Sequence, residues 1–312
     1  MSILEIKKIL KKSFNLTRQN PRFLFLGFFL IFFINYEINV IIGILNQITT
    51  YLVKLINNIK IPIVVQSKEI SNIFILIYNS FQKFNLSNIF VLITIVLFLY
   101  LCLMAQIIVI SLAEYSKQNP NNPKTSLKKI FLKSHKFLGP TIIIYLLLGI
   151  AIFIFLNIPT LFKNYLTSNT LPGWFIISYI IITLLLGLIF GFIAKFSLFF
   201  VIIKKEKLSL SIQKSAKFFF ENWFTIIKIS LSLLIATILF GLIIFLIYTG
   251  IFIPTFLFLH LLLHLCSPSF YLIIITALTF IVSVIFLMLL SFFAYFQFLV
   301  WPLYFTKSVK KM

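Results

Sequence analysis

The sequence contains no aspartate, and its six acidic residues are all glutamates. It also has no glycine-rich phosphate loop, no closely spaced carboxylates, and no serine–histidine or cysteine–histidine arrangement with catalytic spacing. The two cysteines, Cys102 inside an apolar run and Cys266 before the last apolar segment, do not indicate a disulfide. These absences predict that the protein is not an enzyme and holds no cofactor.

Charged residues are also scarce: they make up 11% of the chain, against about a quarter in soluble proteins. The mean hydropathy is +1.12, and residues 229–306 include no charged side chain, which is enough chain to cross a bilayer and return. A β-barrel would need alternating apolar and polar positions, whereas residues 89–105 and 176–194 are apolar on every face. The sequence therefore predicts membrane-spanning helices.

Six apolar segments have the length of a transmembrane helix. They cover residues 23–45, 87–113, 137–158, 174–203, 223–248 and 270–300. Trp174, Trp223 and Trp301 fall at segment ends, where interfacial aromatic residues are common. The predicted fold class is all-α, a polytopic membrane protein of about six transmembrane helices.

The distribution of positive charge predicts the orientation. With six spans, 22 of the 27 lysines and arginines fall on the side that carries both termini, and 5 fall on the other. The positive-inside rule makes the basic side cytoplasmic, so both termini are expected in the cytoplasm. No aromatic platform accompanies the basic segments, so we expect membrane lipids, anionic ones in particular, as partners and no nucleic acid.

Three basic amphipathic segments look alike and each precedes an odd-numbered span. Their shared pairs are Lys12-Ser13, Lys133-Ser134 and Lys214-Ser215. They predict one integral membrane domain, residues 1–312, built from three repeats of a basic interfacial helix plus a transmembrane hairpin. The repeats are expected at 1–116, 117–203 and 204–312, and the first carries an external amphipathic insertion at 46–86.

These motifs resemble a known group of proteins. The repeated Lys-Ser helices, Asn222-Trp223, and the run Phe23-Leu24-Phe25-Leu26-Gly27-Phe28-Phe29 followed by Glu37 are similar to six-span bacterial proteins related to the membrane domain of glycerophosphoryl diester phosphodiesterases. In that family a separate soluble domain performs catalysis, and no segment of this chain matches such a domain. The resemblance implies a stand-alone membrane module in a bacterial plasma (inner) membrane, with no catalytic residue to transfer.

Four charged residues are candidates for a functional or structural polar cluster. Glu37 lies near the outer end of the first span, where it either handles cations or protons, or is simply solvated. Glu114, Lys195 and Lys228 fall near cytoplasmic span ends. They either form a buried ion-pair cluster that joins three helices or snorkel separately to lipid headgroups.

His260 and His264 are four residues apart and Cys266 is nearby, so they are weak candidates for a metal site. The third ligand and the intervening glutamate of a zinc-protease helix are missing, and we expect no metal. Residues 254–266 are too short to cross a bilayer as a helix, and predict a re-entrant or interfacial helix.

Three functions remain open on the sequence alone. The first is a non-enzymatic membrane module with a lipid-facing or envelope-assembly role, favoured by the three basic helices. The alternative is a small permease or channel, favoured by Glu37 and the short apolar helix. The third is an intramembrane enzyme that uses His260 and His264. Protein partners and oligomeric state are not indicated by any motif.

Overall fold

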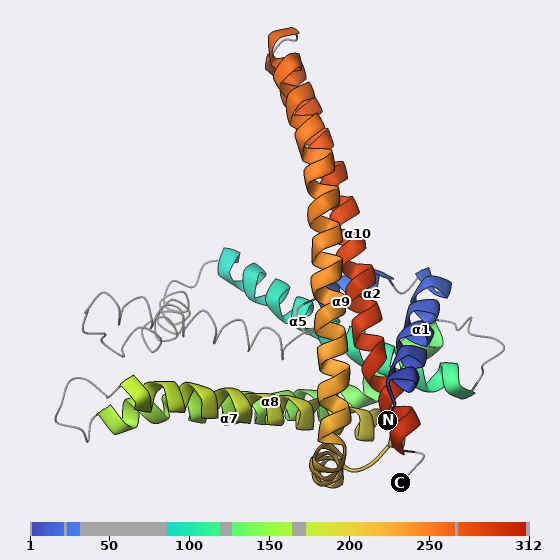
Figure 1. Cartoon of the computed structure of the whole chain (residues 1–312), viewed down its shortest axis with the longest axis vertical. Coiled ribbons are helices and arrows are strands. Elements are labelled where there is room, and N and C mark those ends of the chain that lie inside the picture. The colour runs from blue at the N-terminus through green and yellow to red at the C-terminus, as the bar shows by residue number, and fades with distance from the viewer. Residues whose placement is uncertain are drawn as a thin grey trace. The chain divides into compact units, whose positions relative to one another are not determined.

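The structure, a computed structural model, describes residues 2–21, 24–31, 86–118, 127–163, 173–265 and 268–309 (Figure 1). These ranges are almost wholly helical and contain no strand. The helices are α1 (Ile3–Gln19), α2 (Leu24–Leu30), α5 (Leu86–Gln118), α6 (Leu127–Ser134), the 3-10 turn η2 (His135–Phe137), α7 (Leu138–Lys163), α8 (Gly173–Lys204), α9 (Leu208–Leu265) and α10 (Pro268–Ser308). The all-α prediction is confirmed for this part of the chain.

Five of these helices are long and apolar enough to cross a membrane. The apolar stretches are Phe90–Ser116, Ile130–Ala151, Leu185–Lys204, Leu208–Thr255 and Leu272–Ser308. By length and composition, these helices are compatible with a multi-pass membrane protein. The first predicted span overlaps α2, but its residues 32–45, which include Glu37, lie outside the described ranges. So do residues 46–85 of the insertion predicted at 46–86.

Two expectations about the last two spans were wrong. The helix α9 runs without interruption from the third basic segment to Leu265, so the expected separate helix at 254–266 is absent and Pro254 lies inside α9. Trp301 is buried at 6% exposure and does not form part of an exposed interfacial belt. In both places the apolar residues on either side continue the helix, and hydropathy alone does not show where a helix turns.

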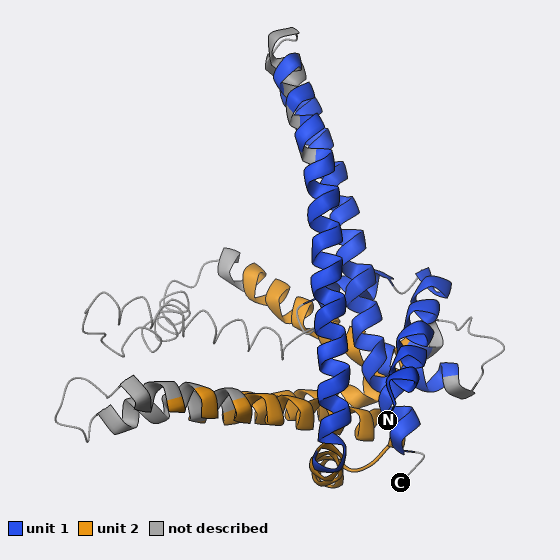
Figure 2. Ribbon diagram, in the orientation of Figure 1, with its two compact units in different colours: residues 1–34, 108–130, 220–312 blue, residues 35–107, 131–219 orange. Residues whose placement is uncertain are grey.

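The chain divides into two compact units, which we describe separately (Figure 2). The first unit contains residues 1–34, 108–130 and 220–312, and the second contains residues 35–107 and 131–219. In the first unit α10 packs against α1 and α2, and in the second α7 packs against α8. The sequence predicts a single domain with three consecutive repeats, whereas these two units are each built from separate segments of the chain. The threefold repeat stays a prediction.

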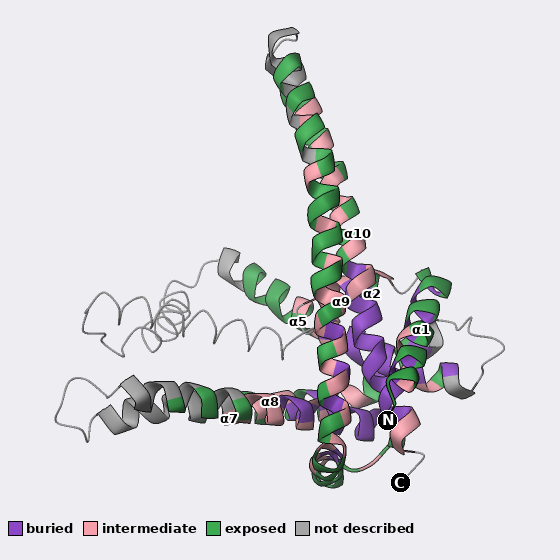
Figure 3. Cartoon of the chain, viewed as in Figure 1, coloured by how far each residue is buried: buried purple, intermediate pink, exposed green. Residues whose placement is uncertain are grey.

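Burial along α8 and α10 changes partway through each helix (Figure 3). In α10 the residues from Ser291 to Thr306 are mostly buried, whereas many apolar side chains before Ser291 are exposed. In α8 a similar change occurs near Gly191. Side chains are therefore enclosed by protein mainly toward the C-terminal end of each helix, and it is there that the basic helices meet them.

Candidate functional site: three basic helices on span ends

The first basic helix, α1, begins at a complete capping box. The Ser2 hydroxyl accepts a hydrogen bond from the Glu5 backbone N–H at 3.3 Å, and the Ser2 N–H donates to the Glu5 carboxylate at 3.1 Å. The same carboxylate pairs with the ammonium of Lys307 on α10 at 3.2 Å. One acidic residue thus both starts the N-terminal helix and attaches it to the last helix of the chain.

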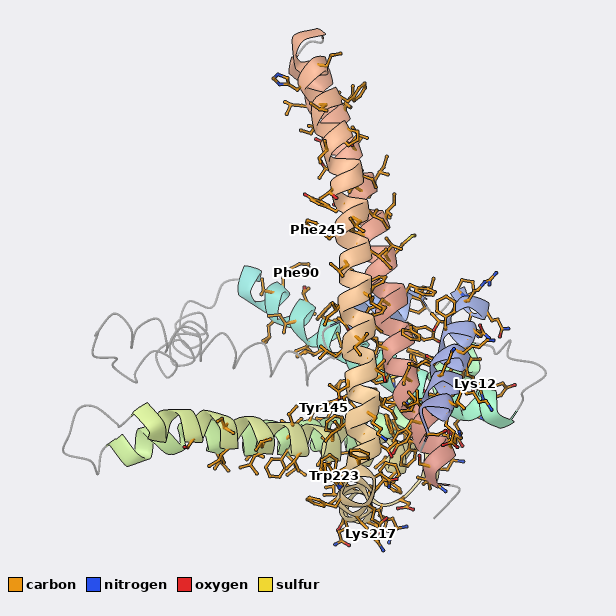
Figure 4. The ribbon with its side chains drawn as sticks, viewed as in Figure 1. Lys12, Phe90, Tyr145, Lys217, Trp223 and Phe245 are labelled. Atoms are coloured by element: carbon orange, nitrogen blue, oxygen red, sulfur yellow. The ribbon has the colours of Figure 1, made fainter. Side chains whose placement is uncertain are left out.

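One face of α1 is buried and the other carries positive charge. The buried positions recur at helical spacing: Ile6, Ile9, Ser13, Leu16 and Thr17. The opposite side exposes Lys7, Lys8, Lys11 and Lys12 (Lys12 is labelled in Figure 4), and the first turn exposes Ile3 and Leu4. The apolar side of α1 therefore packs against protein, and the lysines lie outside this contact.

Aromatic and polar contacts fix α1 on α10. The Phe14 ring meets the rings of Phe292 and Phe296 edge-on, at centroid distances of 5.7 and 6.3 Å. The Ser13 hydroxyl, fully buried, donates to the Phe296 carbonyl at 2.8 Å. The Phe296 carbonyl oxygen has two lone pairs, and Ser13 donates to the one that the helical hydrogen bond of α10 leaves open. A polar side chain is thus hydrogen-bonded inside an otherwise apolar contact.

The third basic segment docks on α8 in the same manner. The hydroxyls of Ser215 and Ser197 lie 2.7 Å apart, and both residues are fully buried. Phe218 packs against Phe196 at a centroid distance of 4.9 Å, and Phe219 stacks on Phe192 at 5.8 Å. This first part of α9 is therefore held by both a polar contact and ring packing.

The second basic segment, α6 and η2, contacts α5. The Tyr100 hydroxyl and His135 Nε2 lie 2.8 Å apart, and the rings are 5.8 Å apart. Ser134 is fully buried, but its hydroxyl has no hydrogen-bond partner among the described residues. This segment repeats the burial of the other two but not their serine hydrogen bond.

Two buried glutamines were not anticipated from the sequence. Gln106 accepts a hydrogen bond from the Tyr145 hydroxyl at 2.5 Å, and Gln297 donates to the Thr237 hydroxyl at 2.6 Å. Gln106 Nε2 and Gln297 Oε1 have no partner within the part of the chain that the structure describes. A lone amide inside a long apolar run was the signal that could have identified both.

The candidate lysines at span ends lie over aromatic rings. Lys195 Nζ is 5.4 Å from the Phe192 ring centroid, and Lys228 Nζ is 4.3 Å from that of Phe224. Glu114 is half-buried near the end of α5. The residues of the predicted three-charge cluster belong to different units, so the cluster stays a prediction. Each of the two lysines makes a cation–π contact with a ring of its own helix.

Only part of the candidate metal site lies among the described residues. His260 is exposed on α9, and the side chain of His264 and all of Cys266 lie outside the described set. Among the residues that the structure describes, no group of three histidine, cysteine or acidic side chains is close enough to hold a metal ion. The expectation that these histidines hold no metal stays a prediction, because two of the three candidate ligands are outside the residues searched.

Comparison with known proteins gives no relative. No protein-family model matches the chain, and no curated protein and no solved structure matches it. The resemblance to the membrane domain of glycerophosphoryl diester phosphodiesterases is thus without support from these comparisons.

Proposed function

We propose that the protein is a non-enzymatic module of a bacterial plasma membrane that binds anionic lipid headgroups on the cytoplasmic face. In this proposal it has six spans in three repeats, and both termini are cytoplasmic. The relation to the phosphodiesterase membrane domain belongs to the same proposal and depends only on the motifs in the sequence.

One observation carries the proposal: in all three Lys-Ser pairs the serine is fully buried and the lysine beside it is exposed. The buried residues are Ser13, Ser134 and Ser215, and the exposed ones are Lys12, Lys133 and Lys214. Solvated linkers do not bury one residue at the same place three times. The segments are therefore docked elements that hold lysines outward at span ends, where each lysine gains about 1 kcal/mol from anionic lipid.

The lysines of α1 provide a direct test of lipid selectivity. Replacing Lys7, Lys8, Lys11 and Lys12 by glutamine should reduce the ratio of anionic to zwitterionic lipid bound to the purified protein several-fold, because most of the headgroup attraction of α1 is lost. Native mass spectrometry in mixed lipid micelles measures the ratio. The matched variant with four arginines keeps the charge and should bind like the wild type. A wild-type protein without preference for anionic lipid would remove the basis of the proposal.

The orientation is tested by cysteine labelling of intact cells, in a background with Cys102→Ala and Cys266→Ala. A membrane-impermeant maleimide should modify Ser80→Cys and Ser168→Cys but not Ser209→Cys, because the positive-inside rule places only the first two outside. Ser209 is exposed and suits this purpose, whereas the nearby Ser211 is fully buried. A permeant maleimide should label Ser209→Cys, which shows that it is reactive. External labelling at Ser209 would reverse the orientation.

A further inference from the structure

The hairpin of α9 and α10 is longer than a membrane is thick. Its register is fixed by the hydrogen bond of Thr237 with Gln297, the stacking of Phe240 on Phe293 at 4.0 Å, and the contact of Tyr248 with Phe286. In this antiparallel register Lys228 lies at the level of Thr306, next to Lys307. The two lysines mark the inner end of the hairpin.

From Lys228 to Thr249, α9 is about 22 residues long, or roughly 33 Å, which matches the hydrocarbon thickness of a bilayer. The hairpin then continues through a tip, which we define as residues 250–265 of α9 and 268–284 of α10. The tip adds roughly 24 Å. A straight helix pair of this combined length would need a tilt of almost 60°, well outside the usual range of tilts up to about 40°.

The tip carries no charged residue. Many of its described residues are exposed on both helices (Figure 3), and several of these have large apolar side chains. Leu257 and Leu261 on α9 are 62% and 58% exposed, and Ile273 and Phe280 on α10 are 66% and 70% exposed. If the tip extended into water, exposing this surface would cost on the order of 25 cal/mol of free energy for each Å² of apolar area. An apolar environment must therefore cover the tip.

The start of the tip has the composition of a hinge. Pro254 has no N–H to donate to the carbonyl four residues earlier, which is that of Gly250. A Cβ added at Gly250 would meet no atom within 4 Å, so the helix is not held by packing at this point. In the structure α9 is continuous through this point, but the missing hydrogen bond makes it the place where bending costs least.

We infer that the tip binds the outer leaflet of the same membrane, by bending at Gly250–Pro254 and laying its apolar side chains among the lipid acyl chains. Because the tip is uncharged, it binds zwitterionic and anionic lipid alike. The inference concerns the outer face of the membrane, whereas the proposed function concerns the basic helices on the cytoplasmic face. It rests on the proposed function only for the orientation of the hairpin.

The experiment uses the full chain without its native cysteines, reconstituted in vesicles, with an environment-sensitive fluorophore at Leu257→Cys or Ile273→Cys. Lipids brominated near the headgroup should quench both probes at least twofold more than lipids brominated at the chain end, and aqueous iodide should quench weakly. Leu242→Cys, 54% exposed on α9 nearer the middle of the membrane, is the matched control, and should show the opposite lipid preference. Replacing zwitterionic by anionic lipid should leave all three unchanged.

Strong iodide quenching at the tip would show a hairpin that extends into water, and would overturn the inference. Protection from both iodide and brominated lipid, with cross-links between tips, would assign the surface to a second copy and overturn it too. The quadruple lysine-to-glutamine variant of α1 separates the two proposals. It should lose anionic lipid preference and keep tip quenching.

Discussion

Replacing Gly27 by alanine should destabilise the protein more than the same change at any other glycine with described surroundings. A Cβ on Gly27 would overlap the carbonyl oxygen of Ser291 and lie 2.6 Å from its carbonyl carbon and 2.9 Å from its Cα. All three are backbone atoms of α10, so no side-chain rotation relieves the overlap. Overpacking of a core costs about 1–3 kcal/mol even where side chains can adjust, and here we expect at least the upper end.

Heating the purified protein in detergent and following its monodisperse fraction by fluorescence-detected gel filtration measures the effect. A loss of about 3 kcal/mol corresponds to roughly 6–12 °C in apparent Tm. Gly241→Ala and Gly187→Ala are matched controls, because a Cβ at either glycine meets nothing within 4 Å. Both lie inside helices, where alanine is favoured over glycine by about 1 kcal/mol, so they should be neutral or stabilising. Equal Tm values for all three variants would show that α2 does not pack closely on α10.

Long apolar helices such as α7 and α8 were predictable because hydropathy is a property of the local sequence. The predicted limits 174–203 and 137–158 fall within α8 and close to α7. A hydrophobic stretch of bilayer length needs no tertiary information to be recognised, since lipid is the same solvent on every side. The helix boundary expected at Pro254 was wrong for the same reason, because the hydropathy stays high on both sides of this proline and α9 continues through it.

The docking of the basic helices was not predictable in the same way. Their amphipathic pattern was interpreted as an apolar face against lipid, but the apolar face of α1 meets α10, with Phe14 against Phe292 and Ser13 against Phe296. Periodicity identifies a buried face but not what buries it. The Ser13 hydroxyl bonds the Phe296 carbonyl of α10, so protein covers this face. A serine can equally bond a carbonyl of its own helix, as Ser215 does with Ile212, so the serines alone did not predict the docking.

Substitution of the three buried serines should also have a large effect, in contrast to substitution of an exposed serine. Ser13→Leu, Ser134→Leu and Ser215→Leu should each reduce folded yield in membranes severely, because all three positions are fully buried and leucine adds two heavy atoms with no space to accept them. Ser209→Leu, at an exposed position of the same helix as Ser215, is the matched control and should fold like the wild type. Wild-type yield for all the leucine variants would show that these segments are undocked linkers.

Alanine at the same positions separates the roles of the three hydroxyls. Ser13→Ala and Ser215→Ala remove hydrogen bonds to Phe296 and Ser197, and each should lower the free energy of unfolding by about 1 kcal/mol. Ser134→Ala should be neutral or slightly stabilising, because it removes a buried hydroxyl that has no partner among the described residues. Thermal unfolding of the three variants in one detergent gives the comparison. A loss at Ser134 as large as at Ser13 would mean that its hydroxyl has a partner after all, and that the three segments are equivalent in hydrogen bonding as well as in burial.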